Sequence, residues 1–344
     1  MRSLLTAFVL ILALTGSGGQ EKIAFIPLPE LGAGPVTLRV VHAVNPRLNR
    51  ITDNELQTLL AETRRTVKTN FNIDLKFDMQ PDTTVANLLA LVPAKPWALQ
   101  RREIYDFKSG GGDRDLLVAG MVKALTLFEK YLADTIKYAR PYLTTPLEDH
   151  SIKGLADAAI STHLERLVHW KNLKTGRGEA VIDATPANEY LAWDLMGYGE
   201  LRYDLVITNQ LVVSAEYQDA DLSASLRGGV TTGATSYSRS GPLRAWSFLS
   251  TFPFIEPDSI PQGMGGMPNR ALAIRIAGEY VAHEIGHLLL HLSHPFGNPR
   301  CVMRAAQVLD YARWSRRLKA KRCKLGSSRA MTPGAAIIRY RTDW

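Results

Sequence analysis

The clearest structural signals of the chain lie in residues 36–79: VTLRVVHAV at 36–44, TDNELQTLLAETRRTVKTNF at 52–71 and IDLKFDM at 73–79. The first run is rich in β-branched residues and predicts a strand. The second opens with Thr52 as a helix cap and then spaces its apolar residues as a helix does. The third alternates like a half-buried strand. A helix of this length between two strands predicts a right-handed crossover to a parallel neighbour.

The segments beyond this unit predict an α+β fold. Residues from about 83 to 170 read mainly as helix and predict a large helical insertion, within which residues 116–139 form one long amphipathic stretch. The run YDLVI at 203–207 predicts a buried strand. The Gly-, Ser- and Thr-rich run at 228–240 predicts an exposed edge strand or hairpin. Residues 269–292 predict a further long helix with an apolar body.

Residues 1–19 read as an export signal. Arg2 supplies a positive start, residues 4–14 are almost wholly apolar, and residues 15–19 are small, as a cleavage site requires. The apolar run is too short to cross a bilayer. A buried N-terminal helix or a short anchor is the alternative. We therefore expect a secreted or periplasmic protein with residues 20–344 as the mature chain and no integral membrane segment after signal cleavage.

The two cysteines of the chain are Cys301 and Cys323. Export would place them in an oxidising compartment, where a disulfide between them is the expected state. Two free buried thiols are the alternative. Two cysteines at this spacing make a poor zinc site by themselves.

The net charge of +8 is concentrated near the end of the chain. The segment from Arg313 to Arg329 contains eight Lys and Arg residues and no acid. Such a segment is usually the solvated face of a helix, although it could also attract an anionic surface. No aromatic interleaving or nucleic-acid motif accompanies it, so we expect no nucleic-acid partner.

One motif carries a specific chemistry: residues 283–287 read HEIGH inside the helix predicted at 269–292. His283 and His287 are four residues apart, so both imidazoles project from one face and can bind one Zn²⁺ at ~2.0–2.1 Å. Glu284 lies beside the pair, where it can act as the general base. The alternative is a helix whose histidines are merely solvated or satisfied in the core.

A catalytic zinc site of this kind needs a third protein ligand. No Glu follows Glu284 in the chain, which excludes the class that uses a Glu on a later helix. On a continued helix, His291 would lie ~12 Å along the axis from His283, too far for a shared metal. His294 precedes a proline that stops helices, so a turn could bring it back to the metal. We prefer His294; His291, if the helix ends early, and Asp310 remain alternatives.

The motif, the later His294 and the run Cys301-Val302-Met303 together resemble the metzincin clan of zinc endopeptidases. That clan shows His-Glu-x-x-His-x-x-Gly-x-x-His followed by a methionine-containing turn beneath the metal. The resemblance implies that Met303 forms this turn. Two features depart from the pattern: Leu290 replaces the Gly, and the third His falls one residue late. Both fit a one-residue insertion in the turn.

The resemblance also implies a twisted mixed sheet that carries the active-site helix, with a C-terminal helix after the methionine turn. The large helical insertion is read from the sequence itself and makes the chain an atypical member of the clan. The strand at 228–240 would align a peptide substrate antiparallel to itself. The sequence thus predicts a secreted zinc-dependent endopeptidase in which His283, His287 and His294 hold Zn²⁺ and Glu284 is the general base. Its metallopeptidase domain would span residues 20–344 and act on protein or peptide substrates. The alternative is a non-catalytic exported protein that binds a metal or a surface on a degenerate peptidase fold.

Overall fold

The computed structural model describes most of the chain between residues 34 and 323. The described residues are 34–92, 94, 114–184, 193, 196, 201–213, 222–238, 244–256, 266–267, 269–290, 292, 299–306, 308–320 and 323. The predicted export signal at 1–19 lies outside them.

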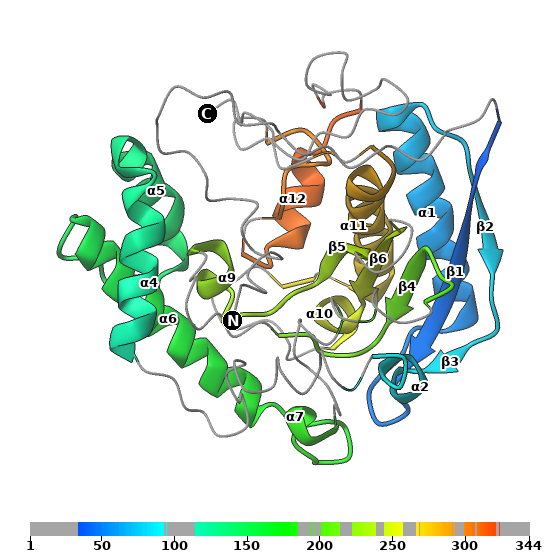
Figure 1. The fold of residues 1–344 in the computed structure, drawn as a ribbon, viewed down its shortest axis with the longest axis horizontal. Helices are drawn as coiled ribbons and strands as arrows, with labels where there is room; N and C mark the ends of the chain where they lie inside the picture. The colour runs from blue at the N-terminus through cyan, green and yellow to red at the C-terminus, as the bar shows by residue number, and fades with distance from the viewer. Residues whose placement is uncertain are drawn as a thin grey trace.

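The strands form one six-stranded mixed sheet, which in Figure 1 runs from β5 near the middle to β2 at the right-hand edge. Its strands are β1 (Val36–Val44), β2 (Leu75–Met79), β3 (Thr83–Thr84), β4 (Leu205–Thr208), β5 (Gly233–Ser238) and β6 (Arg244–Ser250). The order is β2-β1-β4-β6-β5, and β3 pairs with β1. All pairs are parallel except β5 with β6, so β5 is an antiparallel edge strand. The predicted α+β class and the edge strand within 228–240 are confirmed.

The opening strand, helix and strand agree closely with the prediction. β1 has the predicted bounds, and β2 begins two residues later than expected. Helix α1 (Asp53–Phe71) starts with a capping box, in which the Thr52 side chain accepts from the Glu55 backbone and the Glu55 side chain accepts from the Thr52 backbone. It ends where Asn72 adopts a left-handed conformation, with φ of 58°. As expected, α1 connects two parallel neighbours.

Helix α11 (Arg270–Leu290) packs against α1 and against strands β5 and β6. Figure 1 shows α1 and α11 side by side on one face of the sheet. The two helices approach so closely that a Cβ added at Gly278 would lie 2.5 Å from the carbonyl oxygen of Leu59. A small residue at 278 is therefore required where they meet, and this contact holds α11 in place across the sheet.

The residues between β3 and β4 are mostly helical where they are described. The helices are α2 (Val85–Leu89), α4 (Arg114–Thr126), α5 (Leu132–Ala139), α6 (Ile152–Asn172) and α7 (Val181–Ala184), with 3₁₀ turns at Glu129–Tyr131 and Arg140–Tyr142. Figure 1 shows α4, α5 and α6 as a group apart from α1. No helix among the described residues is long and apolar enough to cross a membrane.

The amphipathic stretch predicted at 116–139 is helical but is divided into two helices. The structure ends α4 at Thr126 and starts α5 at Leu132. Between Leu125 and Ile136 no residue is buried. Because helices in proteins depend on packing of an apolar face more than on intrinsic propensity, this unpacked stretch turns instead of continuing.

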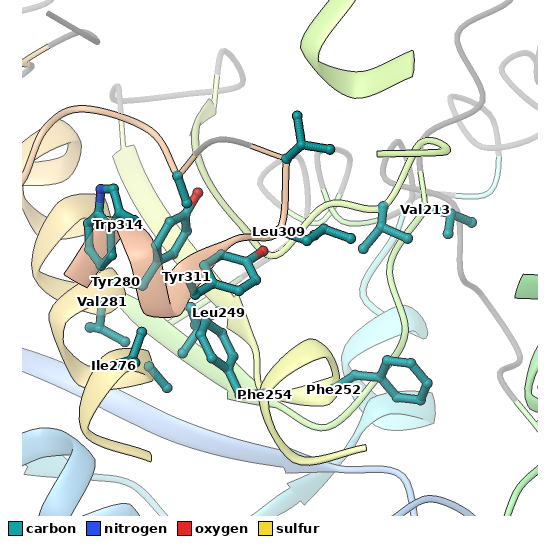
Figure 2. Close-up of a cluster of buried hydrophobic side chains, with 14 of the residues drawn as sticks. Val213, Leu249, Phe252, Phe254, Ile276, Tyr280, Val281, Leu309, Tyr311 and Trp314 are labelled. Atoms are coloured by element: carbon teal, nitrogen blue, oxygen red, sulfur yellow. The ribbon is translucent and has the colours of Figure 1, made fainter. Parts of the chain in front are cut away.

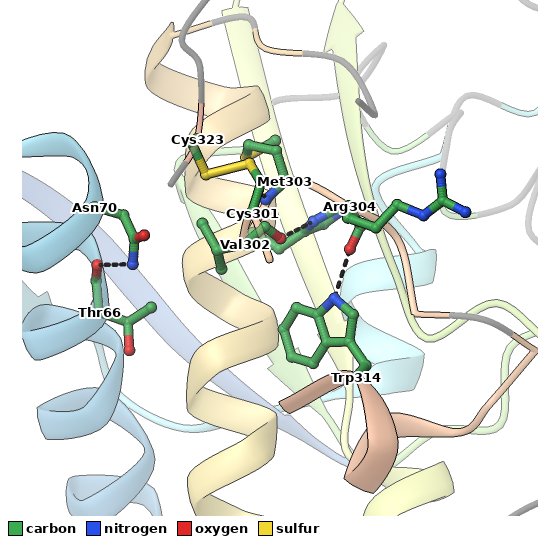
Figure 3. The surroundings of a disulfide bond; sticks show 9 residues. Thr66, Asn70, Cys301, Val302, Met303, Arg304, Trp314 and Cys323 are labelled. Atoms are coloured by element: carbon green, nitrogen blue, oxygen red, sulfur yellow. Dashed lines mark hydrogen bonds between the residues drawn. A yellow bond between two sulfur atoms is a disulfide. The ribbon is translucent and has the colours of Figure 1, made fainter. Parts of the chain in front are cut away.

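Three further helices complete the described fold: α9 (Leu222–Leu226), α10 (Phe252–Ile255) and α12 (Tyr311–Arg317). Helix α12 is the C-terminal helix expected after Met303. The predicted disulfide is present: Cys301 and Cys323 are bonded, with their Cα atoms 4.4 Å apart (Figure 3). It ties residue 323 to the turn that precedes α12.

Candidate metal centre

The two histidines of the helix motif converge. His283 and His287 lie on one face of α11, and their Nε2 atoms are 3.1 Å apart. Two nitrogen ligands at ~2.0–2.1 Å from a tetrahedral zinc ion are separated by roughly 3.3 Å. His283 is buried and His287 is part-buried. The spacing of this pair is therefore compatible with two ligands of one metal ion, and it is also a hydrogen-bond distance.

Backbone carbonyls orient both imidazole rings. His283 Nδ1 donates to the carbonyl oxygen of Val302 at 2.8 Å, and His287 Nδ1 donates to that of Leu292. A carbonyl can only accept, so each Nδ1 carries the proton and each Nε2 presents a lone pair. Two lone pairs that face each other repel unless a proton or a cation lies between them. Backbone carbonyls as second partners are typical of metal-bound histidines.

Burial disfavours a proton between the Nε2 atoms of His283 and His287. It lowers the pKa of His283 well below its ordinary value, and the neighbouring His287 lowers it further. Burial lowers the pKa of His287 to about 4. With protonation disfavoured, the donor set of the pair fits a divalent cation that takes neutral imidazole ligands, and Zn²⁺ is such an ion.

Glu284 extends from α11 towards β5. Its Oε2 accepts a hydrogen bond from Thr235 Oγ1 at 3.1 Å, and its carboxylate lies against Gly233, where an added Cβ would come within 2.7 Å of Oε1. Thr235 is also hydrogen-bonded to Ser247 at 2.7 Å, its paired residue on β6. Burial raises the pKa of Glu284 to about 8, and the Thr235 hydrogen bond opposes this rise. A cation held by the adjacent histidines would favour the charged carboxylate.

The turn containing Met303 passes directly against the motif. A Cβ added at Gly286 would overlap the Met303 sulfur atom and lie 3.0 Å from Phe71. Met303 therefore packs directly against the helix that carries the two histidines. The disulfide holds this turn, because Cys301 lies two residues before Met303 and one before Val302, whose carbonyl orients His283 (Figure 3).

An aromatic cluster supports the other side of His283. The Tyr280 ring stacks on the His283 ring, with centroids 5.1 Å apart and an interplanar angle of 21°. Tyr311 and Trp314 of α12 each pack edge-on to Tyr280 with centroids 5.4 Å apart (Figure 2). The Tyr311 hydroxyl is hydrogen-bonded to Thr232. Burial raises the pKa of Tyr311 to about 12, so the phenol is neutral.

The predicted third ligand cannot be compared with the histidine pair, because it lies outside the described residues. Both His294 and the alternative His291 lie outside the described residues. Among the residues that are described, no group of three or more His, Cys, Asp or Glu side chains is arranged to hold a metal. Asp310 does not join the histidine pair; its carboxylate accepts from the Arg313 backbone as the N-cap of α12.

The sequence alone did not indicate several of the residues that contact the histidine pair and Glu284. Tyr280 had a usable signal, because it lies three residues before His283 on the same helical face. Thr235 was recognised only as a strand residue, and nothing in its local sequence indicates Glu284 as its partner. No protein-family model matches the chain, and neither a curated protein nor a solved structure is significantly similar to it.

Proposed function

We propose that this protein is an exported zinc-dependent peptidase of metzincin type. The observation that carries the proposal is the pair of Nε2 lone pairs on His283 and His287, 3.1 Å apart and fixed by backbone carbonyls. The buried carboxylate of Glu284 on the same helix supplies the base, and the Cys301–Cys323 disulfide supports export because cytosolic thiols are kept reduced.

Each residue has a defined role in this proposal. His283, His287 and His294 hold Zn²⁺. When bound, the ion polarises the scissile carbonyl and lowers the pKa of water. Glu284 takes a proton from the attacking water on its carboxylate and delivers it to the departing amine nitrogen. Thr235 and Gly233 hold that carboxylate in place.

Strand β5 is suited to bind an extended peptide. Among the described strands it pairs only with β6 and stands at the end of the sheet, where a further strand could add to it. A peptide added there would form main-chain hydrogen bonds along the edge. Gly233 and Thr235 of this strand contact Glu284, so a peptide on β5 would lie near the general base.

Zinc analysis and proteolysis of the purified mature chain test the proposal together. We expect about one zinc per chain and hydrolysis of casein. Glu284→Gln should retain zinc and lose activity by at least about a thousandfold, while His287→Ala should lose zinc. Among third-ligand candidates, His294→Ala should lose zinc, whereas His291→Ala and Asp310→Asn should retain it.

Two outcomes would count against a peptidase. If the wild-type chain binds no zinc, the proposed metal centre is refuted. A chain that binds zinc but cleaves nothing in a broad peptide library would leave a non-catalytic exported metal- or surface-binding protein on the same fold.

A further inference from the structure

Strand β2 forms the edge of the sheet opposite to β5. Among the described strands it pairs only with β1, and Figure 1 draws it at the right-hand edge of the sheet. Its five residues read LKFDM, and their side chains alternate between the two faces. Leu75, Phe77 and Met79 pack against the hydrophobic core that includes α1, whereas Lys76 and Asp78 are exposed. This edge therefore carries one positive and one negative side chain on its exposed face.

The backbone of β2 directs every second residue away from β1. The Asp74 carbonyl oxygen accepts from the Val36 N–H at 2.8 Å, and the Gln80 N–H donates to the Val40 carbonyl oxygen at 2.8 Å. Because this pairing alternates with a period of two, the even-numbered residues of β2 direct their peptide groups to β1 and the odd-numbered residues direct theirs outward. The outward N–H and C=O groups can pair with a further strand.

A second copy of the same strand fits this edge in one register. If two β2 strands pair antiparallel about Phe77, each outward-directed residue lies opposite another outward-directed residue, as a hydrogen-bonded pair requires. The same register places Lys76 of each copy opposite Asp78 of the other. A shift by two residues would place two Lys76 or two Asp78 side chains opposite each other, and like charges in that position are destabilising. Backbone direction and side-chain charge therefore select the same register.

A row of alternating charges crosses the exposed face and ends at this edge. Arg39 of β1 forms an ion pair with Asp204 at 2.8 Å, and the register of the sheet places Arg39 beside Asp78 of β2. Lys76 of a second copy, opposite Asp78, would add the next charge of this series. A two-fold interface makes each contact twice, so both copies would gain the same continuation.

We propose that this protein forms a homodimer in which two β2 strands pair antiparallel about Phe77 and join the two sheets into one. The interface is self-complementary, so it closes as a dimer and does not extend into a filament. Strand β5 lies at the other end of each sheet, so its edge stays available in the dimer. The proposal does not depend on zinc binding or peptidase activity. Because only the five residues of β2 pair on each copy, we expect a weak dimer.

Sedimentation equilibrium of the full mature chain over about 1–500 μM tests the proposal, because this range covers weak protein association. The test variants are Lys76→Asp and Asp78→Lys, each of which places like charges opposite each other in its own homodimer. An equimolar mixture of the two variants places opposite charges together again and should form a heterodimer. The matched controls are Lys137→Asp and Asp134→Lys, which make the same changes in net charge at exposed positions of α5.

We expect the wild type to dimerise reversibly and each β2 variant to dimerise at least about tenfold more weakly. The mixture of the two variants should associate within about threefold of the wild type, and the controls should dimerise as the wild type does. A wild type that stays monomeric over the whole range would overturn the proposal. So would β2 variants that dimerise as tightly as the wild type, a mixture that does not restore association, or an equal loss in the controls.

Discussion

Thr235 Oγ1 lies 3.1 Å from Glu284 Oε2 and 3.2 Å from the Glu284 carbonyl oxygen. A hydroxyl from the edge strand thus holds both the side chain and the backbone of the residue proposed as general base. Ser247, at 2.7 Å from the same hydroxyl, is fully buried and fixes it from β6. The Glu284 carboxylate is therefore positioned by two strands as well as by its own helix.

Replacing Thr235 by Val should lower kcat about 10- to 100-fold, because a hydrogen bond to a charged group is worth roughly 1.5–3 kcal/mol. KM and zinc content should not change, since neither the β5 backbone nor the histidines are altered. Steady-state kinetics on a peptide substrate measures this effect. Thr235→Ser keeps the hydroxyl and should restore most of the activity. A Val variant as active as the wild type would show that the hydroxyl does not position Glu284.

Gly278 should be essential for the packing of α1 against α11. Gly278→Ala would place a methyl group 2.5 Å from the Leu59 carbonyl, a backbone atom that cannot move alone. We expect a loss of about 1–3 kcal/mol in the free energy of unfolding, despite the roughly 1 kcal/mol by which Ala favours a helix interior. Urea unfolding measures the change. Gly176→Ala is the control, because an added Cβ there meets nothing within 4 Å. If the two variants had equal free energies of unfolding, α1 and α11 could move apart to fit the methyl group without loss of stability.

His163 should make the fold sensitive to acid. Burial lowers its pKa from 6.5 to about 4, so the unfolded chain binds a proton in this window while the folded chain does not. The free energy of unfolding is therefore highest above the unfolded pKa and falls as the pH decreases through the window. Between about pH 7.5 and about pH 4, the free energy of unfolding should fall by up to about 3 kcal/mol less in His163→Gln than in the wild type. Urea unfolding of both proteins at about pH 7.5 and about pH 4 measures it. The prediction would be contradicted if the variant and the wild type differed in free energy of unfolding by the same amount at both pH values.

The disulfide should stabilise both the fold and the metal centre. It closes a loop of 22 residues, for which the loss of chain entropy in the unfolded state is worth about 3 kcal/mol. Cys301→Ser with Cys323→Ser should lower the unfolding temperature. It should also weaken zinc binding, because the turn with the Val302 carbonyl is less constrained. Thermal unfolding and competition with a chelator measure the two effects. If the variant were less stable but bound zinc with unchanged affinity, the disulfide would stabilise the fold without affecting the proposed metal centre.

Local sequence determined the elements of this fold whose hydrogen bonds and side-chain periodicity lie within one segment. The bounds of β1, the cap at Thr52, the buried strand β4 and the long helix α11 all follow from residues close together in the chain. The motif at 283–287 also indicated the histidine pair, because a helix places residues four apart on the same face.

Tertiary structure decided everything that depends on partners distant in sequence. The sequence did not indicate β6 as a separate strand, since its place in the sheet comes from pairing with β4 and β5. Nor did it indicate that the chain turns after Thr126, where packing against the core ends. The contacts of Glu284 with Thr235 and of His283 with Val302 join residues 49 and 19 positions apart. Such contacts form only when the sheet and the two central helices come together, because their energy depends on three-dimensional proximity and on the exclusion of water.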